Sequence, residues 1–186
     1  FFMEKVYQAS KPTHNSSLAV SGAAAIAAAV SYGVHIGDDL QEMLSWVNKA
    51  AGAGRKYGRE LGYPHVEKRL ALTLDLLSRC HDDGERTLLL HESLGSSVQT
   101  IESVTAALAA VILHEARIRP TLAFTANLGG DTDTISAMAG AICGALKGAQ
   151  SLPEQDLALI DAVNLISLKR IASDLESAAC IYESAT

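Results

Sequence analysis

The segment Asn127-Leu-Gly-Gly-Asp-Thr-Asp-Thr-Ile135 runs directly into Ser136-Ala-Met-Ala-Gly-Ala-Ile-Cys-Gly-Ala-Leu-Lys-Gly148. Gly129-Gly130 predicts a sharp turn, because glycine adopts positive φ without a steric penalty. The small residues after this turn predict a helix on which Gly140, Gly144 and Gly148 share one face. Each glycine costs a helix about 1 kcal/mol relative to alanine, so this stripe predicts a close approach by another helix or by a ligand.

The Asp-Thr-Asp-Thr turn carries the chemistry of a hard-cation site. Asp131 and Asp133 are two residues apart, and the Thr134 hydroxyl follows the second carboxylate. Mg²⁺ and Ca²⁺ prefer oxygen ligands of these kinds. Helix capping is the other interpretation, because Asp and Thr at a helix start accept hydrogen bonds from free N–H groups and suit the helix dipole. Spacing alone does not decide between the two.

Three segments, in the same order along the chain, resemble the ADP-ribosylglycohydrolases. Leu128-Gly-Gly-Asp-Thr-Asp-Thr-Ile135 and the glycine-rich helix after it are similar to the C-terminal signature of that family. Thr13-His14 and the alanine-rich stretch that follows resemble its Thr-His segment. Leu94-Gly-Ser-Ser-Val98 and the following Glu102–Leu108 resemble its glycine-rich loop and next helix, although Thr105 stands where proline is expected.

The resemblance implies hydrolysis of the bond between C1″ of ADP-ribose and an acceptor, with oxocarbenium-like character as in other glycoside hydrolysis. The expected cofactor is a pair of Mg²⁺ ions, with Mn²⁺ as an alternative. The expected partner is an ADP-ribosylated protein or an ADP-ribose-containing small molecule, and the linkage stays open between arginine, serine and acetyl ester. The residues implied by the resemblance are, for metal, Asp131, Asp133 and Thr134, and, for substrate, His14, Gly95, Ser96 and Ser97.

One part of the family pattern is missing. The family has a second metal motif, Ser/Thr-Asp-Asp-Thr, which neither Gly37-Asp38-Asp39-Leu40 nor His81-Asp82-Asp83-Gly84 matches. We therefore expect the chain to correspond to the C-terminal portion of a longer family domain. The catalytic residues would lie in an N-terminal part, and this chain alone would be inactive. Two alternatives are a non-catalytic member that binds ADP-ribose or a nucleotide, and a structural, crystallin-like member.

The length predicts a single domain over residues 1–186, and the lack of a convincing strand signal predicts an all-α, irregular multi-helix bundle. The resemblance implies that this bundle is of the ADP-ribosylglycohydrolase type. Hydrophobic residues make up 48% and aromatic residues 5%, so the core should be aliphatic and alanine-rich. The net charge of −6 argues against a nucleic-acid partner. Three widely separated cysteines suit a reducing, cytoplasmic location, with buried thiols as their expected role.

Helix signals place the expected elements. The apolar stretch 18–34 is short and weak for a membrane span, so a buried helix ending at Gly33 and no membrane contact are expected. The glycine-rich, basic stretch 51–64 is expected to be a solvated connection, with Arg55 or Arg59 at a diphosphate as the alternative. Other expected helices are listed by approximate range: 37–51, 66–80, 85–91, 96–114, 120–127, from 153, and 168–182. The Glu102 carboxylate is expected to complete a capping arrangement, and the alternative is that it points at a site.

Overall fold

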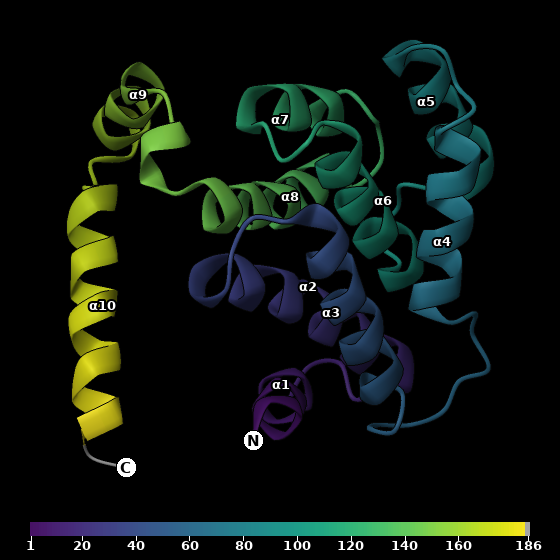
Figure 1. The fold of residues 1–186 in the computed structure, drawn as a ribbon, viewed down its shortest axis with the longest axis horizontal. Coiled ribbons are helices and arrows are strands. Elements are labelled where there is room, and N and C mark those ends of the chain that lie inside the picture. Colours follow the sequence, from purple (N-terminus) through teal and green to yellow (C-terminus); the bar gives the residue numbers. More distant parts are fainter. Residues whose placement is uncertain (185–186) are drawn as a thin grey trace. The chain divides into compact units, whose positions relative to one another are not determined.

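The computed structural model describes the backbone of residues 1–184 and the side chains of residues 1–180. Within that range the secondary structure is helical and contains no strand, so the predicted all-α class is confirmed. The elements, shown in Figure 1, are α1 (Phe2–Ser10), α2 (Ser17–His35), α3 (Leu40–Gly54), α4 (Val66–Leu77), α5 (Asp83–Leu89), η1 (Leu90–Leu94), α6 (Thr100–Leu113), α7 (Ile118–Ala126), α8 (Thr132–Lys147), η2 (Ala149–Ser151), α9 (Glu154–Asn164) and α10 (Leu168–Ser184).

The helices group into two compact units, residues 1–149 and the chain from residue 150 onward. The buried hydrophobic side chains of the described residues all belong to the first unit, and they end at Leu146. The prediction of one domain over residues 1–186 concerns how the two units combine, and it stays a prediction.

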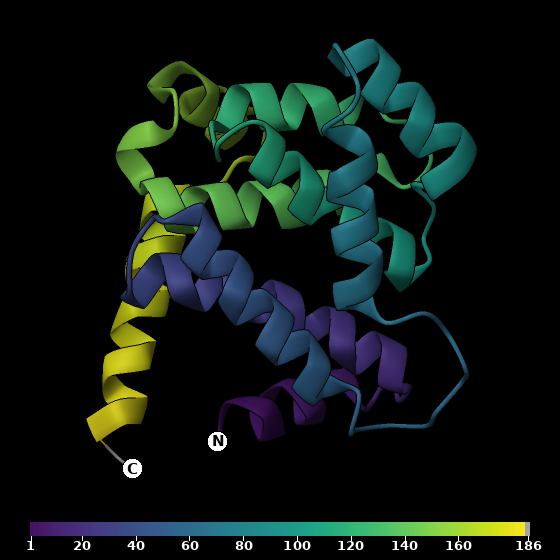
Figure 2. The same cartoon turned by 45° about the vertical axis from the view of Figure 1, so that its right-hand side comes forward.

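The core of the first unit is built around α6. Most of its side chains are buried, from Ile101 to Val111, and α8, α4 and α2 pack against it. Helix α2 also lies along α3 and packs against α8, as Figures 1 and 2 show. Alanine makes up much of the interface, because small side chains let helix backbones approach closely. The predicted alanine-rich, aliphatic core is confirmed.

Helices α2 and α8 approach each other closely at Gly33, which the sequence pattern predicted to be the end of α2. A Cβ on Gly33 would lie 2.7 Å from the backbone carbon of Ala145. Gly33 therefore does not end α2, which continues to His35. On α8, Gly140 would meet only Leu122, at 3.3 Å, whereas Gly144 faces open space. The prediction that a helix approaches the glycine stripe is therefore wrong at Gly144, and the alternative of a ligand there stays a prediction.

Helix α2 is long and apolar enough to cross a membrane by length and composition, and half of its most apolar window is buried in the first unit. Its N-cap is Ser16, whose hydroxyl accepts a hydrogen bond from the Ala19 N–H at 3.2 Å. Its burial against α3, α6 and α8 matches the expectation of a core helix.

Several helix boundaries differ from the sequence prediction. Residues 2–10 form α1, which the sequence analysis did not anticipate. Ser96 and Ser97 do not begin a helix; α6 starts at Thr100, with Gln99 as its N-cap. The displaced start has a physical reason, because Gly95, directly after η1, has a φ of +88° and the chain turns there before the next helix.

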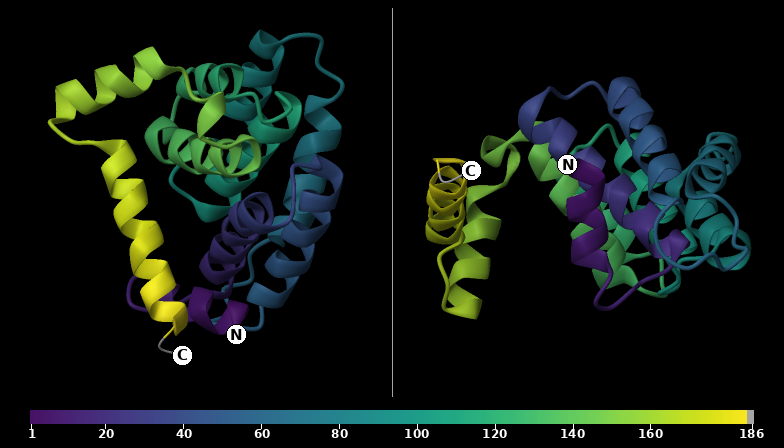
Figure 3. Two further views of the ribbon diagram at one scale, coloured as in Figure 1. Left: turned by 60° about the vertical axis from the view of Figure 1, so that its left-hand side comes forward. Right: turned by 90° about the horizontal axis from the view of Figure 1, so that it is seen from below.

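The second unit contains α9 and α10, described here by themselves. Pro153 is the N-cap of α9 and not its first residue, so the helix begins at Glu154, one residue later than predicted. Leu165 ends α9 in the left-handed conformation, and the chain bends there into α10 (Figure 3). The described side chains of α9 are not buried, and Leu159, Val163 and Leu165 are largely exposed.

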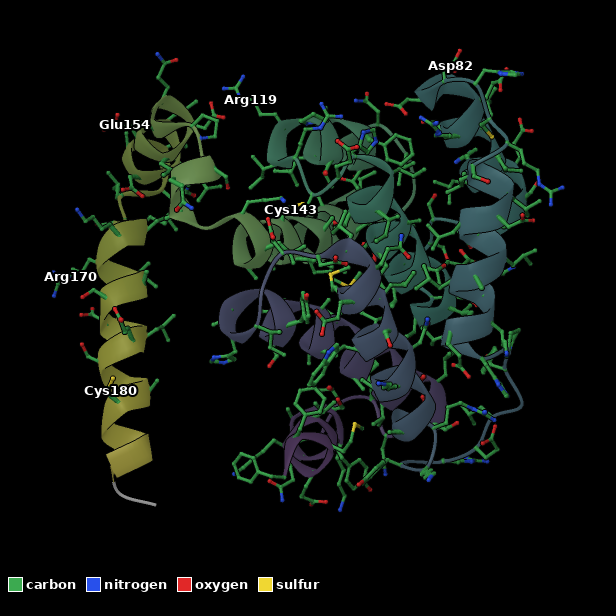
Figure 4. All side chains as sticks on the ribbon, in the orientation of Figure 1. Asp82, Arg119, Cys143, Glu154, Arg170 and Cys180 are labelled. Carbon is green, nitrogen blue, oxygen red and sulfur yellow. The ribbon has the colours of Figure 1, made fainter. Side chains whose placement is uncertain are left out.

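The three cysteines occupy different environments. Cys143 on α8 is buried, Cys80 is half-buried and Cys180 on α10 is exposed; Cys143 and Cys180 are labelled in Figure 4. The expectation of buried thiols therefore holds for Cys143 and is wrong for Cys180. Burial raises the pKa of the Cys143 thiol, so this thiol is protonated and unreactive at neutral pH.

Candidate metal and substrate site

The Gly129-Gly130 turn presents the two carboxylates. Both glycines have positive φ, +74° and +72°, which confirms the turn predicted from the sequence. The Asp131 N–H donates to the Ser96 carbonyl at 2.8 Å. A Cβ on Gly130 would overlap that same carbonyl. The absence of a side chain at Gly130 thus brings the loop of Gly95–Ser97 against the start of α8.

Asp131 stands at the N-cap of α8, yet its side chain accepts no hydrogen bond from the helix backbone. Its Oδ1 instead accepts the Thr134 hydroxyl at 2.9 Å. Asp39, at the start of α3, shows what capping looks like in this protein, because its Oδ1 accepts from the N–H groups of Gln41 and Glu42. Asp133 is exposed in the first turn of α8. Both carboxylates therefore have lone pairs available to a ligand.

His14 and Thr134 line one cavity of about 790 Å³, although they are far apart in sequence. The His14 Nδ1 lies 2.9 Å from the Thr13 hydroxyl, so Nε2 is the ring nitrogen available to a ligand. The apolar wall comes from α2, and Val98 and Met138 complete it. A cavity of this size suits a ligand as large as a nucleotide.

Gly95, Ser96 and Ser97 line a different cavity, of about 430 Å³, together with Gly130. The predicted substrate residues are thus divided between two cavities. Asp131 and Asp133 line neither of these two cavities. Gly130, directly before them, lines the smaller cavity, and Thr134, directly after them, lines the larger one.

The Glu102 side chain folds back onto the loop before its own helix. Its Oε2 accepts the Ser97 N–H at 2.9 Å, and a Cβ on Gly95 would overlap its carboxylate. The predicted capping of α6 by Glu102 is wrong, because the N–H that it binds belongs to the preceding loop and not to the N-cap residue Gln99; Glu102 lines the smaller cavity instead. By binding that N–H, Glu102 fixes the conformation of the Gly95–Ser97 loop.

The basic stretch 51–64 is separate from both cavities. Arg55 donates to the His65 Nδ1 at 2.9 Å, and the backbone of Arg59 pairs with Asn15 and Ser17. This arrangement agrees with the expected connection between helices. Residues that the sequence analysis missed as cavity lining are Arg69, His91, Val98 and Met138. Their positions depend on tertiary packing, and no local pattern marks them.

Two carboxylates and a hydroxyl on one turn fit part of the oxygen shell of Mg²⁺. Within the described residues, no group of three or more His, Cys, Asp or Glu side chains converges as a metal site. The turn therefore fits the ion as a partial ligand set.

The sequence over residues 2–182 matches the ADP-ribosylglycohydrolase family. The chain belongs to this family. An ADP-ribosylglycohydrolase assignment agrees with the all-helical structure and makes the chain a member of a family of hydrolases. The expectation that the chain is the C-terminal part only is not borne out by this match, which covers nearly all of it.

Curated relatives include the Escherichia coli K12 protein YegU, described as uncharacterized, which is 35% identical over 94% of this chain and 52% of its own length. The ADP-ribosylhydrolase ARH3 of Mus musculus is 32% identical over 76% of this chain and 42% of its own length. The Homo sapiens ARH3 is 31% identical, with corresponding shares of 76% and 43%. The chain thus spans about half the length of these relatives. No solved structure matches this chain.

Proposed function

We propose that the protein hydrolyses the glycosidic bond linking ADP-ribose to an acceptor, and that the reaction depends on Mg²⁺. The chain spans about half the length of its curated relatives, so the proposal concerns the whole protein. The observation that carries it is the Gly-Gly-Asp turn. It holds Asp131 and Asp133 at a helix start without using either carboxylate as a backbone cap, and Thr134 opens onto the His14 cavity.

The residues of this chain have distinct proposed roles. Asp131, Asp133 and Thr134 supply part of the Mg²⁺ ligands, and the bound ion would polarise water or a ribose hydroxyl. His14 contacts the substrate in the larger cavity, whose apolar α2 wall suits a flat base. Gly95, Ser96 and Ser97 position the start of α8 through the hydrogen bond from Asp131 to Ser96. The 186-residue chain by itself is expected to be inactive, because three oxygen ligands on one turn compete poorly with the hydration of Mg²⁺.

The test is release of ADP-ribose from arginine-, serine- and acetyl-ester-linked substrates by the whole protein, with Mg²⁺ or with EDTA. EDTA should abolish release, and Mg²⁺ or Mn²⁺ should restore it. Asp131→Asn and Asp133→Asn should each lower kcat by about a hundredfold or more, as removal of an electrostatic contributor does elsewhere. Asp174→Asn, on the exposed α10, is the matched control and should behave as wild type.

Two results would contradict the proposal. Release that is insensitive to EDTA and to both substitutions would exclude the turn as a metal site. Tight binding of ADP-ribose without release from any of the three linkages would instead support a non-catalytic, ADP-ribose-binding member of the family.

A further inference from the structure

The cavity of about 430 Å³ contains an arginine without a partner. Arg69 of α4 lines it, and the Arg69 Nε is fully buried with no hydrogen-bond acceptor among the described residues. The ion pairs of those residues do not include Arg69 either. A buried donor is normally satisfied, and a guanidinium presents its N–H groups in a fork that matches phosphate or carboxylate oxygens.

The other charged groups of the cavity restrict what the ligand can be. Glu92 of η1 is exposed, Glu102 of α6 is half-buried, and His91 stands beside them. Glu102 already accepts one hydrogen bond, from Ser97, but a carboxylate has further lone pairs. Two carboxylates repel a bare oxyanion and need hydrogen-bond donors. The ligand must therefore present an oxyanion to Arg69 and hydroxyl groups to Glu92 and Glu102.

We propose that this cavity binds a small phosphorylated sugar. The Arg69 guanidinium donates to the phosphate, and the carboxylates of Glu92 and Glu102 accept hydrogen bonds from sugar hydroxyls. The volume lies in the lower part of the range for small-molecule sites. The phosphorylated sugar has two sources, a free sugar phosphate or the ribose phosphate of ADP-ribose itself. The proposal does not depend on hydrolysis by this protein.

The experiment is calorimetric titration of the whole protein with ribose 5-phosphate, ribose and inorganic phosphate. Ribose 5-phosphate should bind more tightly than either of its parts. Arg69→Gln should weaken this binding about tenfold or more, because a charge-assisted hydrogen bond to a buried group is lost. Lys68→Gln removes the same charge from the neighbouring exposed position and should leave binding unchanged.

Glu92→Gln is a second test variant, and the fold should tolerate it because the Glu92 side chain is exposed. The substitution should lower the ratio of ribose 5-phosphate affinity to inorganic phosphate affinity, since the charged acceptor of sugar hydroxyls becomes a weaker neutral one and the repulsion of phosphate disappears. A ratio equal to that of wild type would overturn the role of the carboxylates. Equal binding of ribose 5-phosphate to wild type and Arg69→Gln, or no binding to wild type, would overturn the site.

ADP-ribose titrations separate the two sources. If ADP-ribose competes with ribose 5-phosphate and weakens with Arg69→Gln, the cavity takes the ribose phosphate of ADP-ribose. If ADP-ribose binding responds to His14→Ala and not to Arg69→Gln, the cavity takes a free sugar phosphate. Both results support the site. Absence of ADP-ribosyl hydrolysis would contradict the proposed function and would leave these titrations unaffected.

Discussion

Asp131 occupies the N-cap position of α8, but its side chain accepts none of the helix N–H groups. The contrast with Asp39, which accepts two backbone N–H groups, separates a carboxylate that stabilises a helix from one that is available to a ligand. Resemblance at the sequence level does not distinguish these two roles, because Asp suits both.

The contrast predicts different stability effects. Asp39→Ala should lower the free energy of unfolding by about 1 kcal/mol, the usual effect of removing an N-cap. Asp131→Ala should lower it by less than about 0.5 kcal/mol, as for other surface positions. Urea denaturation of the two variants measures both values. An equal loss for the two variants would show that Asp131 stabilises α8 and would weaken the metal assignment.

Gly130 has positive φ and also has no room for a Cβ, whereas Gly62 has positive φ but an open surrounding. Their φ angles are +72° and +70°, but no atom lies within 4 Å of a Cβ built on Gly62. Gly62→Ala should lower the free energy of unfolding by about 1 kcal/mol through φ. Gly130→Ala should add a further 1–3 kcal/mol, roughly, because the methyl group overlaps the Ser96 carbonyl. Equal losses, measured by urea denaturation, would mean that the Ser96 loop moves away freely.

At the level of elements, α5, α6 and α7 meet at His114. This residue ends α6, its ring lies 5.1 Å from the Phe124 ring of α7, and its Nε2 lies 3.7 Å from a carboxylate oxygen of Asp83 in α5. Asp82, labelled in Figure 4, marks the start of α5. Burial is the main cause that lowers the pKa of the His114 imidazole; the Asp83 carboxylate, next in size, raises this pKa, and Arg86 and Arg117 lower it further.

A lowered pKa predicts how stability depends on pH. Below the ordinary histidine pKa of about 6.5, the unfolded chain binds a proton that the folded chain resists. The free energy of unfolding should therefore fall as pH falls below that value. His114→Gln should reduce this fall, whereas His81→Gln, at an exposed position, should not. Urea denaturation across that pH range checks the prediction, and identical pH dependence in wild type and His114→Gln would refute it.

For the whole molecule, the buried hydrophobic residues lie in residues 1–149, and α9 and α10 contribute none among the described side chains. A chain ending at Ala149 should therefore unfold cooperatively, with a melting temperature within a few degrees of the parent. A chain ending at Gly130 loses the buried Ile135, Ala139 and Ile142 of α8 and should not fold. Thermal melts followed by circular dichroism compare the two truncated chains. Non-cooperative unfolding of the chain that ends at Ala149 would show that the second unit stabilises the first.

Local signals in the sequence determined the helical class, the positive φ of Gly129 and Gly130, and the three segments that mark the family. Each of these depends on backbone preferences within a few residues, which a sequence states directly. The tertiary structure decided that Gly33 is the glycine at the α2–α8 contact, that the Ser96 carbonyl binds the Asp131 N–H, and that His14 and Thr134 share a cavity. It also placed Arg69 beside the Gly95–Ser97 loop. These contacts join residues far apart in the chain, and their geometry depends on how whole helices pack, which no local pattern encodes.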